Sequence, residues 1–146
     1  MLEDLQNRKN YSSLKNYVES VLKNKKNVIS IILFGSQAKG TYSYNSDFDL
    51  FIIIENEPTR FIDRLLEFGR YSDGLVEPLI YTRDEVEYMV NTYHTMVLEV
   101  CADGIILYDK NQFWVNKCKK IKCLIDKKII KRIKNGWDLR LLDQIK

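Results

Sequence analysis

Residues 33–50 read LFGSQAKGTYSYNSDFDL and join two strongly apolar runs of the chain. The first run is VISIILF at residues 28–34, and the second is DFDLFIII at residues 47–54, apolar throughout after Asp49. Both are short and rich in β-branched and aromatic residues, which indicates strands buried on both faces in the middle of a sheet. The polar segment between them contains two glycines and predicts a loop. The skeleton is therefore a strand, Gly-Ser, ten residues, Asp-x-Asp and a second strand.

The two acids of this motif, Asp47 and Asp49, lie at the start of the second strand. Residues two apart in a strand point to the same face, roughly 6–7 Å from each other. Two like charges at the entrance of an otherwise buried strand are unfavourable without compensation. A divalent cation supplies that compensation, and carboxylates that leave positions open for phosphate oxygens are typical of magnesium sites. The pair therefore predicts magnesium bound by Asp47 and Asp49.

Gly35 and Ser36 lie where the first strand ends. Glycine lets the backbone approach a phosphate closely. The amide and hydroxyl of Ser36 are able to donate to β- or γ-phosphate oxygens, more so if a helical turn begins there, and Lys39 adds a positive charge nearby. Gly-Ser and Asp-x-Asp each also occur in ordinary turns. Their order and spacing between two buried strands favour a phosphate and metal site over a structural turn.

The same stretch resembles the signature of the DNA polymerase β-like nucleotidyltransferase superfamily, which is Gly-Ser, about ten residues, then Asp-x-Asp or Asp-x-Glu. GSQAKG and SDFDL are similar to segments of the minimal nucleotidyltransferases of archaea and bacteria, where arginine is commoner at the place of Lys39. The resemblance implies an α+β fold with a mixed sheet flanked by helices, and two magnesium ions. It assigns Asp47 and Asp49 to the metal. It assigns Gly35 and Ser36 to the phosphates, and we also expect Lys39 and Ser46 to bind the nucleotide.

A third carboxylate is expected from a later, adjacent strand. The segment GLVEPLIYTRDE at residues 74–85 offers Glu77, and it resembles the Val-Glu segment of the aminoglycoside nucleotidyltransferases. The resemblance implies that Glu77 is a shared metal ligand or a base that orients the attacking hydroxyl. Pro78 beside it is a departure, because proline lacks a ladder donor. Asp73 is the alternative third carboxylate, and a water-facing glutamate on an edge strand is the structural alternative for Glu77.

The remaining periodicities predict helices that cover the sheet. Helices are expected at residues 2–23, 58–70, 92–101 and 112–133, with a short one after Thr82, and strands at residues 75–81 and 105–108. Thr82 with Glu85 three residues later is a capping-box pattern. Tyr42 and Tyr44 are close enough to the motif to stack on a nucleotide base.

Positive charge is concentrated in the last quarter of the chain. Residues 1–110 contain 12 Lys/Arg and 17 Asp/Glu, whereas residues 111–146 contain 11 and 3, which leaves +3 overall. We therefore divide the chain into a nucleotidyltransferase domain at 1–110 and a helical extension at 111–146, packed on the same domain. The extension is expected to be a basic amphipathic helix that Gly136 ends in a left-handed cap, followed by apolar residues that fold back. A solvated basic face is favoured over an RNA-binding surface, because aromatic residues are not interleaved with the basic ones.

Composition also limits where the protein works. The N-terminal segment is too polar for a signal peptide, and no apolar run is long enough to span a membrane. The spacing of Cys101, Cys118 and Cys123 is not that of a metal knuckle. We therefore expect a cytoplasmic protein with reduced cysteines and no membrane partner.

The family resemblance implies a magnesium-dependent nucleotidyltransferase that moves a nucleoside monophosphate, with AMP from ATP preferred, to a protein or small-molecule acceptor and releases pyrophosphate. The family resemblance also allows an antitoxin role beside a helical toxin partner. Two alternatives come from other classes of protein. One is a binding protein that keeps the nucleotide site without turnover, and the other is an RNA-binding accessory protein that uses the basic helix.

Overall fold

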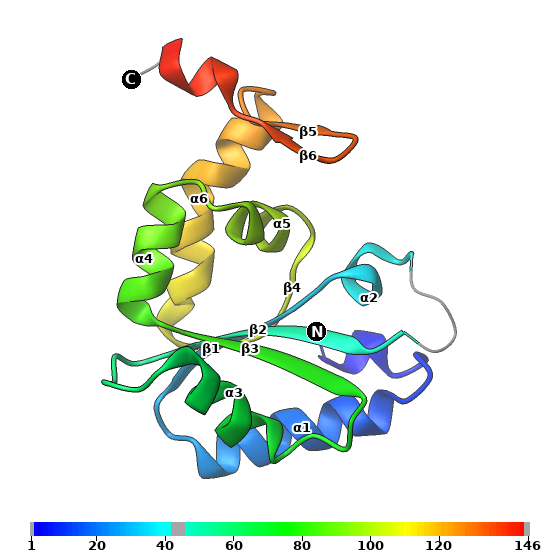
Figure 1. The fold of residues 1–146 in the computed structure, drawn as a ribbon. Helices are drawn as coiled ribbons and strands as arrows, with labels where there is room; N and C mark the ends of the chain where they lie inside the picture. The colour runs from blue at the N-terminus through cyan, green and yellow to red at the C-terminus, as the bar shows by residue number, and fades with distance from the viewer. Residues whose placement is uncertain (1, 42–45, 145–146) are drawn as a thin grey trace.

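The computed structural model describes residues 2–41 and 46–144, and its centre is a four-stranded sheet with strand order β3-β2-β1-β4 (Figure 1). The strands are β1 (Val28–Phe34), β2 (Phe48–Ile54), β3 (Val76–Thr82) and β4 (Ile105–Asp109). β1 is antiparallel to β2 and to β4, whereas β2 and β3 are parallel. The predicted mixed sheet is confirmed, and its two interior strands are those that flank the motif. Tyr42 and Tyr44, predicted to stack on a base, lie outside the described residues.

Helices cover both faces of this sheet (Figure 1). One face is covered by α1 (Tyr11–Asn24) and α3 (Phe61–Gly69), and the other by α4 (Arg83–Asn91), α5 (Thr95–Asp103) and α6 (Phe113–Asp126). A single helical turn, α2 (Ser36–Lys39), follows directly after β1 and Gly35. Most helix and strand ends lie within about three residues of their predicted places.

β2 is apolar at every position after Asp49 because both of its faces are buried. Its even-numbered residues Leu50, Ile52 and Ile54 pack into the core on the α1 and α3 side. Phe51 and Ile53 pack into the core beneath α4, α5 and α6. All five side chains are fully buried. A strand with a hydrophobic core on each side reads as a continuous apolar run rather than an alternating one.

The helix predicted at residues 2–23 is wrong at its start. A short 3-10 helix, η1 (Leu2–Leu5), is separated from α1, which begins only at Tyr11. Asn10 precedes α1 in the left-handed conformation, with φ of 65°. The intervening residues 6–10 are all polar. They offer no side chain for the core, so nothing stabilises a continuous helix there.

The helix predicted at residues 112–133 is wrong at its end. α6 stops at Asp126 in a Schellman motif, in which the amides of Lys128 and Ile129 donate to the carbonyls of Ile125 and Leu124 at 3.0 and 2.9 Å. Lys128 takes the left-handed position of the motif, with φ of 60°. The change of direction buries Ile130 completely in the core shared by α4, α5 and α6.

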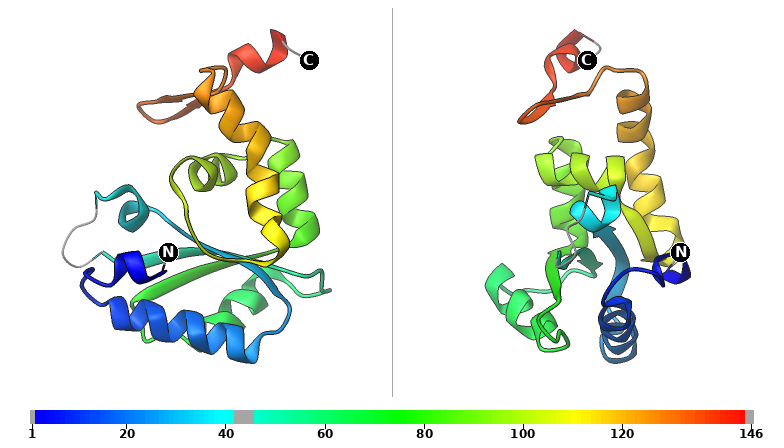
Figure 2. Two further views of the ribbon diagram at one scale, coloured as in Figure 1. Left: turned by 180° about the vertical axis from the view of Figure 1, so that it is seen from behind. Right: turned by 90° about the vertical axis from the view of Figure 1, so that its right-hand side faces the viewer.

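A hairpin replaces the rest of the predicted helix. It consists of β5 (Lys131–Ile133) and β6 (Gly136–Asp138), and a 3-10 helix, η3 (Arg140–Gln144), follows it. Gly136 therefore begins a strand instead of ending a helix. α6 starts beside the sheet and runs away from it, so the hairpin and η3 lie at its far end (Figure 2). The predicted folding back of the terminus is confirmed, because Leu142 is buried in the same core and Trp137 and Leu139 pack against it.

The amphipathic character predicted for α6 is confirmed. Its buried side chains recur every three or four residues: Trp114, Cys118, Ile121 and Leu124. The lysines between them face outwards, so the basic residues form the solvated side of a packed helix. No helix within residues 2–41 or 46–144 is long and apolar enough to cross a membrane.

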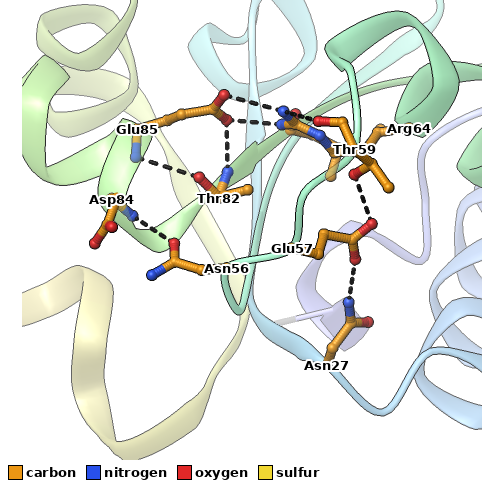
Figure 3. Close-up of polar contacts among 9 residues, drawn as sticks. Asn27, Asn56, Glu57, Thr59, Arg64, Thr82, Asp84 and Glu85 are labelled. Carbon is orange, nitrogen blue, oxygen red and sulfur yellow. Dashed lines mark hydrogen bonds and ion pairs between the residues drawn. The ribbon is translucent and has the colours of Figure 1, made fainter.

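Arg64 of α3 connects α3 and α4 to the carboxyl end of β3 through hydrogen bonds (Figure 3). Its buried guanidinium donates to both carboxylate oxygens of Glu85 in α4, at 2.7 and 3.0 Å, and to the carbonyls of Ile80 and Thr59. Glu85 also accepts from the amide of Thr82 at 2.8 Å, and the hydroxyl of Thr82 accepts from the amide of Glu85. The predicted capping box is therefore confirmed. This network fixes the end of the sheet that lies away from the Asp-x-Asp motif.

Glu85→Ala is expected to destabilise the fold by about 2–4 kcal/mol, because the variant leaves the buried charge of Arg64 without its carboxylate and removes half of the capping box. Urea unfolding measures the change. Glu87→Ala is the matched control, since Glu87 lies on the same helix and forms an exposed pair with Lys117 at 3.1 Å, of the kind that contributes up to about 1 kcal/mol. Equal losses in the two variants would show that Arg64 does not depend on Glu85.

Candidate active site

Three acidic residues, Asp47, Asp49 and Glu77, lie near one another where β2 and β3 begin. Asp49 is the register partner of Glu77 on the neighbouring parallel strand, and of Phe34 on β1. Register partners point to the same face of a sheet, as do Asp47 and Asp49 two residues apart. Asp49 shares its face with Phe51 and Ile53, so the three acids lie on the side covered by α4, α5 and α6. Asp47 and Asp49 are half-buried, whereas Glu77 is exposed on the edge strand.

The electrostatics of the group centre on Asp49. Burial, together with the nearby charges of Glu77 and Asp47, raises the pKa of Asp49 to about 6, from an ordinary value of 3.8. Each of these causes disfavours the ionised form. Glu77 therefore faces Asp49 closely enough to repel it, which an isolated glutamate on an edge strand would not do. The site carries an excess of negative charge.

This donor set fits a hard divalent cation. Carboxylate oxygens are the ligands that magnesium prefers, and a cation between the acids would reverse the repulsion felt by Asp49. Within residues 2–41 and 46–144 no group of three or more acidic, histidine or cysteine side chains is gathered closely enough to form a preformed metal centre. Asp47, Asp49 and Glu77 are thus neighbours whose side chains are not yet converged on one point.

Gly35 forms the turn between β1 and α2 and lies directly against Asp49. Its backbone has φ of 74° and ψ of −159°, a combination that is essentially confined to glycine. A Cβ atom at this position would overlap Oδ2 of Asp49 and come within 3.3 Å of its Cγ. The amides of Ala38 and Lys39 both donate to the Gly35 carbonyl at 3.1 Å, which starts the helical turn of α2. The structure therefore brings the Gly-Ser turn and the Asp-x-Asp strand into contact.

Gln37 connects the two halves of the motif, a role that was not predicted. Its side chain is buried, and its Nε2 donates to the carbonyl of Ser46 at 3.0 Å. Arg8 donates to the backbone carbonyl of Gln37 at 3.1 Å. Ser46, predicted to contact the nucleotide, is thereby joined to α2 through its backbone carbonyl. The sequence signal was its place within GSQAKG, where an amide is able to bond a backbone group.

Lys39 lies at the end of α2 and pairs with Glu99 of α5, another residue that was not predicted. Lys39 Nζ is 3.1 Å from Glu99 Oε2. Arg132 of β5 approaches the same oxygen at 3.3 Å, and the indole of Trp137 in β6 donates to the other oxygen at 3.1 Å. Glu99 thus joins α2 to the C-terminal hairpin. Glu99 lies 60 residues from Lys39 in the chain, so no local sequence pattern could predict this ion pair.

Asp73, the alternative third carboxylate, is engaged in the turn before β3. Its Oδ2 accepts from the hydroxyl of Ser13 in α1 at 2.6 Å, and its Oδ1 accepts from the amide of Leu75 at 3.1 Å. The hydrogen bond from Ser13 and that from Leu75 lower the pKa of Asp73. Glu77 is instead the register partner of Asp49. The geometry therefore favours Glu77 over Asp73 as the third acid of the site.

Asp49→Asn is expected to stabilise the metal-free protein at pH 8 but not at pH 4. The folded-state pKa of about 6 lies above the ordinary 3.8, so the folded protein carries the penalty of an ionised Asp49 above pH 6. As the pH falls from 6 to 4 the folded state takes up the proton first, and the penalty disappears. Because solvent screens a half-buried group, we expect a gain of about 1–2 kcal/mol at pH 8. Urea unfolding in EDTA at both pH values measures it, and an equal gain at pH 4 would contradict this cause.

Gly35→Ala is expected to lower the free energy of unfolding by about 2–4 kcal/mol, through backbone strain and overlap with Asp49. Gly40→Ala is the matched control, because Gly40 also has a positive φ, of 78°, but an added Cβ there meets nothing within 4 Å. The control should lose only about 1–2 kcal/mol of left-handed strain. Thermal or urea unfolding distinguishes the two, and losses of equal size would mean that the contact with Asp49 carries no cost.

Comparison with known proteins agrees with this geometry. The family model for polymerase beta nucleotidyltransferases matches residues 16–113. A candidate protein adenylyltransferase of Methanocaldococcus jannaschii is 38% identical over 115 residues, which cover 73% of this chain and 73% of that protein. A second candidate protein adenylyltransferase of the same organism is 35% identical over 85 residues, or 50% of this chain and 84% of the relative.

Solved structures share the fold at low sequence identity. A candidate nucleotidyltransferase from Sulfolobus solfataricus superposes with a TM-score of 0.53 at 20% identity, covering 69% of this chain and 81% of that one. A toxin–antitoxin structure with AMP-PNP gives a TM-score of 0.51 at 17% identity, covering 79% and 88%. The family match extends over more than half of the chain and includes the whole motif from Gly35 to Asp49. The chain belongs to the polymerase beta nucleotidyltransferase family and is a nucleotidyltransferase.

Proposed function

We propose that this chain transfers AMP from ATP to a hydroxyl group of a protein acceptor and releases pyrophosphate. The observation that carries the proposal is the placement of Asp49 between Asp47 and Glu77, with the Gly35 turn packed against it. This arrangement supports a phosphate-binding role for the Gly35–Ser36 turn and a divalent cation beside the neighbouring acids. Those are the two features that nucleotidyl transfer requires.

The bond changes follow from this placement. The acceptor oxygen forms a bond to the α-phosphorus of ATP, the bond from that phosphorus to the bridging oxygen breaks, and pyrophosphate leaves with the electron pair. Divalent ions held by Asp47, Asp49 and Glu77, with magnesium preferred, would neutralise the charge on the phosphate oxygens. Glu77 orients the acceptor hydroxyl at the exposed edge of β3, and a carboxylate or solvent accepts its proton. Gly35 and Ser36 hold the outer phosphates, with Lys39 and Ser46 beside them.

The choice of adenylate and of a protein acceptor rests on relatives. The two Methanocaldococcus jannaschii proteins are both named as candidate protein adenylyltransferases, and one of them shares 38% of aligned residues with this chain. A toxin–antitoxin pair of the same fold was solved with AMP-PNP. These similarities support ATP as the donor and a helical protein partner, of the toxin kind, as the acceptor. The partner is expected to approach the exposed edge of the sheet, where Glu77 lies.

The decisive experiment is transfer of radiolabel from α-labelled ATP to a copurified partner protein. Label on the partner is expected with magnesium and not with EDTA, accompanied by one pyrophosphate per label. Labelling from γ-labelled ATP would show that the enzyme moves a terminal phosphate and would overturn the proposal. Tight ATP binding with no pyrophosphate release in the presence of the partner would support the alternative of a binding protein without turnover.

A further inference from the structure

A cavity lies away from the three carboxylates, between α5, the end of α6 and the β5–β6 hairpin. Its volume is about 660 Å³, which is within the range of small-molecule sites. Ile125, Ile130 and Trp137 give it apolar wall, and charged residues surround them. The charged lining consists of Lys122, Lys128, Lys131, Arg132, Asp103 and Asp126. Four cations face two acids, so the cavity is suited to an anion.

Arg132 differs from the three lysines of the cavity because it forms ion pairs. Arg132 donates to Asp103 at 2.7 Å and to Glu99 at 3.3 Å, and its guanidinium stacks 4.7 Å from the ring centre of Trp137. Within the described part of the chain, Lys122, Lys128 and Lys131 form no ion pair. Three lysines from α6, its end and β5 therefore line one space without an ion pair, although Asp138 lies opposite Lys131 in the hairpin, where the charge of Lys131 helps to lower the Asp138 pKa. Positive charge therefore exceeds negative charge along this lining, which favours an anion over a cation.

Lys128 adds an independent observation. It occupies the left-handed position that ends α6, with φ of 60°, where glycine is the usual residue and a side chain is strained. The Schellman hydrogen bonds around it do not require a side chain. Glycine would therefore suit the backbone better at this place. Lys128 thus brings an ammonium group to the cavity from a backbone position where glycine is the usual residue.

We propose that this cavity binds a small phosphate-bearing anion through Lys122, Lys128 and Lys131. A phosphate group matches three point charges that approach from different elements, because its oxygens accept from several directions at once. The site is distinct from the nucleotide site of Gly35 and Asp49, and it does not depend on the proposed transfer reaction. Arg132 borders it while also bonding Glu99, the partner of Lys39, so the two sites are neighbours joined by one carboxylate.

The test is calorimetric titration with pyrophosphate in EDTA, a condition that removes the divalent ion expected at the carboxylates. Wild-type protein and Asp63→Asn should bind equally, since Asp63 lies on α3, pairs with Arg60 and does not line the cavity. Lys122→Ala should weaken binding about tenfold or more, the loss typical of one charged hydrogen bond. Lys128→Gly should weaken it similarly while its melting temperature stays the same or rises by about 2–4 °C. That pair of results would not arise from a purely structural lysine.

Lys120→Ala is the matched control, because Lys120 lies on the exposed side of the same helix and does not line the cavity. It should bind pyrophosphate as the wild type does. Equal weakening by Lys120→Ala and Lys122→Ala would show diffuse attraction to a basic helix and would overturn the proposal. Absence of pyrophosphate binding by the wild type would overturn it as well. A single-stranded RNA that binds tightly, and is weakened equally by all three lysine variants, would identify the face as a nucleic-acid surface instead.

Discussion

Asp49→Asn is expected to remove nucleotidyl transfer, with a loss of more than about 1000-fold in kcat/KM. Asp49 is the central acid of the site, with Asp47 on its own strand and Glu77 as its register partner on the next. An amide has the shape of the carboxylate but cannot offset the charge of a divalent ion. The loss should therefore exceed the 10–100-fold that is typical when a residue only supports a metal ligand. Pyrophosphate release in the presence of ATP, magnesium and the partner protein measures it.

Binding of a non-hydrolysable ATP analogue gives a second measurement of the same prediction. Calorimetry should find strong binding to the wild type in magnesium and weak binding in EDTA. The Asp49→Asn variant should bind weakly in both conditions. Asp63→Asn is the control, since Asp63 is an exposed carboxylate on α3 that pairs with Arg60 at 2.9 Å. If the wild type binds the analogue equally in EDTA, the carboxylates do not hold a metal against the triphosphate.

The central part of the fold could be predicted because its cause is local. β1 and β2 are buried on both faces, and that burial leaves an uninterrupted apolar run in the sequence. The capping box of Thr82 and Glu85 is likewise a pattern of four consecutive residues. Asp47 and Asp49 could be proposed as site residues for the same reason, because two charges at the start of a buried strand contrast with their immediate neighbours.

The parts that could not be predicted depend on contacts between distant segments. Glu99 reads as one acid in an apolar helix, and only the fold shows that it joins Lys39 to Arg132. The sequence did not predict the early end of α6, because Lys128 occupies the left-handed position where glycine is the usual signal for the end of a helix. Periodicity continued past that point, since Ile129 and Ile133 kept the helical spacing. Burial of Ile130 outweighed the pattern.

The structure distinguishes the surroundings of Glu77 from those of Asp73. The sequence offered Glu77 and Asp73 as the third acid, and both lie near the start of β3. Register favours Glu77, which lies beside Asp49 and raises its pKa. Asp73 accepts hydrogen bonds from Ser13 and Leu75, which gives it a structural role in the preceding turn. Exposure of Glu77 is consistent with a residue that must meet an incoming acceptor.

Glu77→Gln is therefore expected to reduce AMP transfer by more than about 100-fold while the affinity for ATP stays largely intact. Two carboxylates of one strand suffice to hold a metal ion against the triphosphate, whereas the third is needed to bring the acceptor hydroxyl to the same place. The expected result is thus a fall in kcat with little change in the dissociation constant of an ATP analogue. Radiolabel transfer from α-labelled ATP to the partner protein, together with calorimetry, separates the two quantities.

Asp73→Asn is the matched control, because it neutralises the other acid near the start of β3. The amide keeps the size of the side chain in the turn before that strand. It should transfer at nearly the wild-type rate and lose at most about 1–2 kcal/mol of stability from the weakened bonds to Ser13 and Leu75. Normal transfer by Glu77→Gln together with failure by Asp73→Asn would reverse the assignment. If Glu77→Gln instead weakens ATP binding as strongly as Asp49→Asn does, Glu77 holds the metal for the nucleotide, and the acceptor hydroxyl must be oriented by another group.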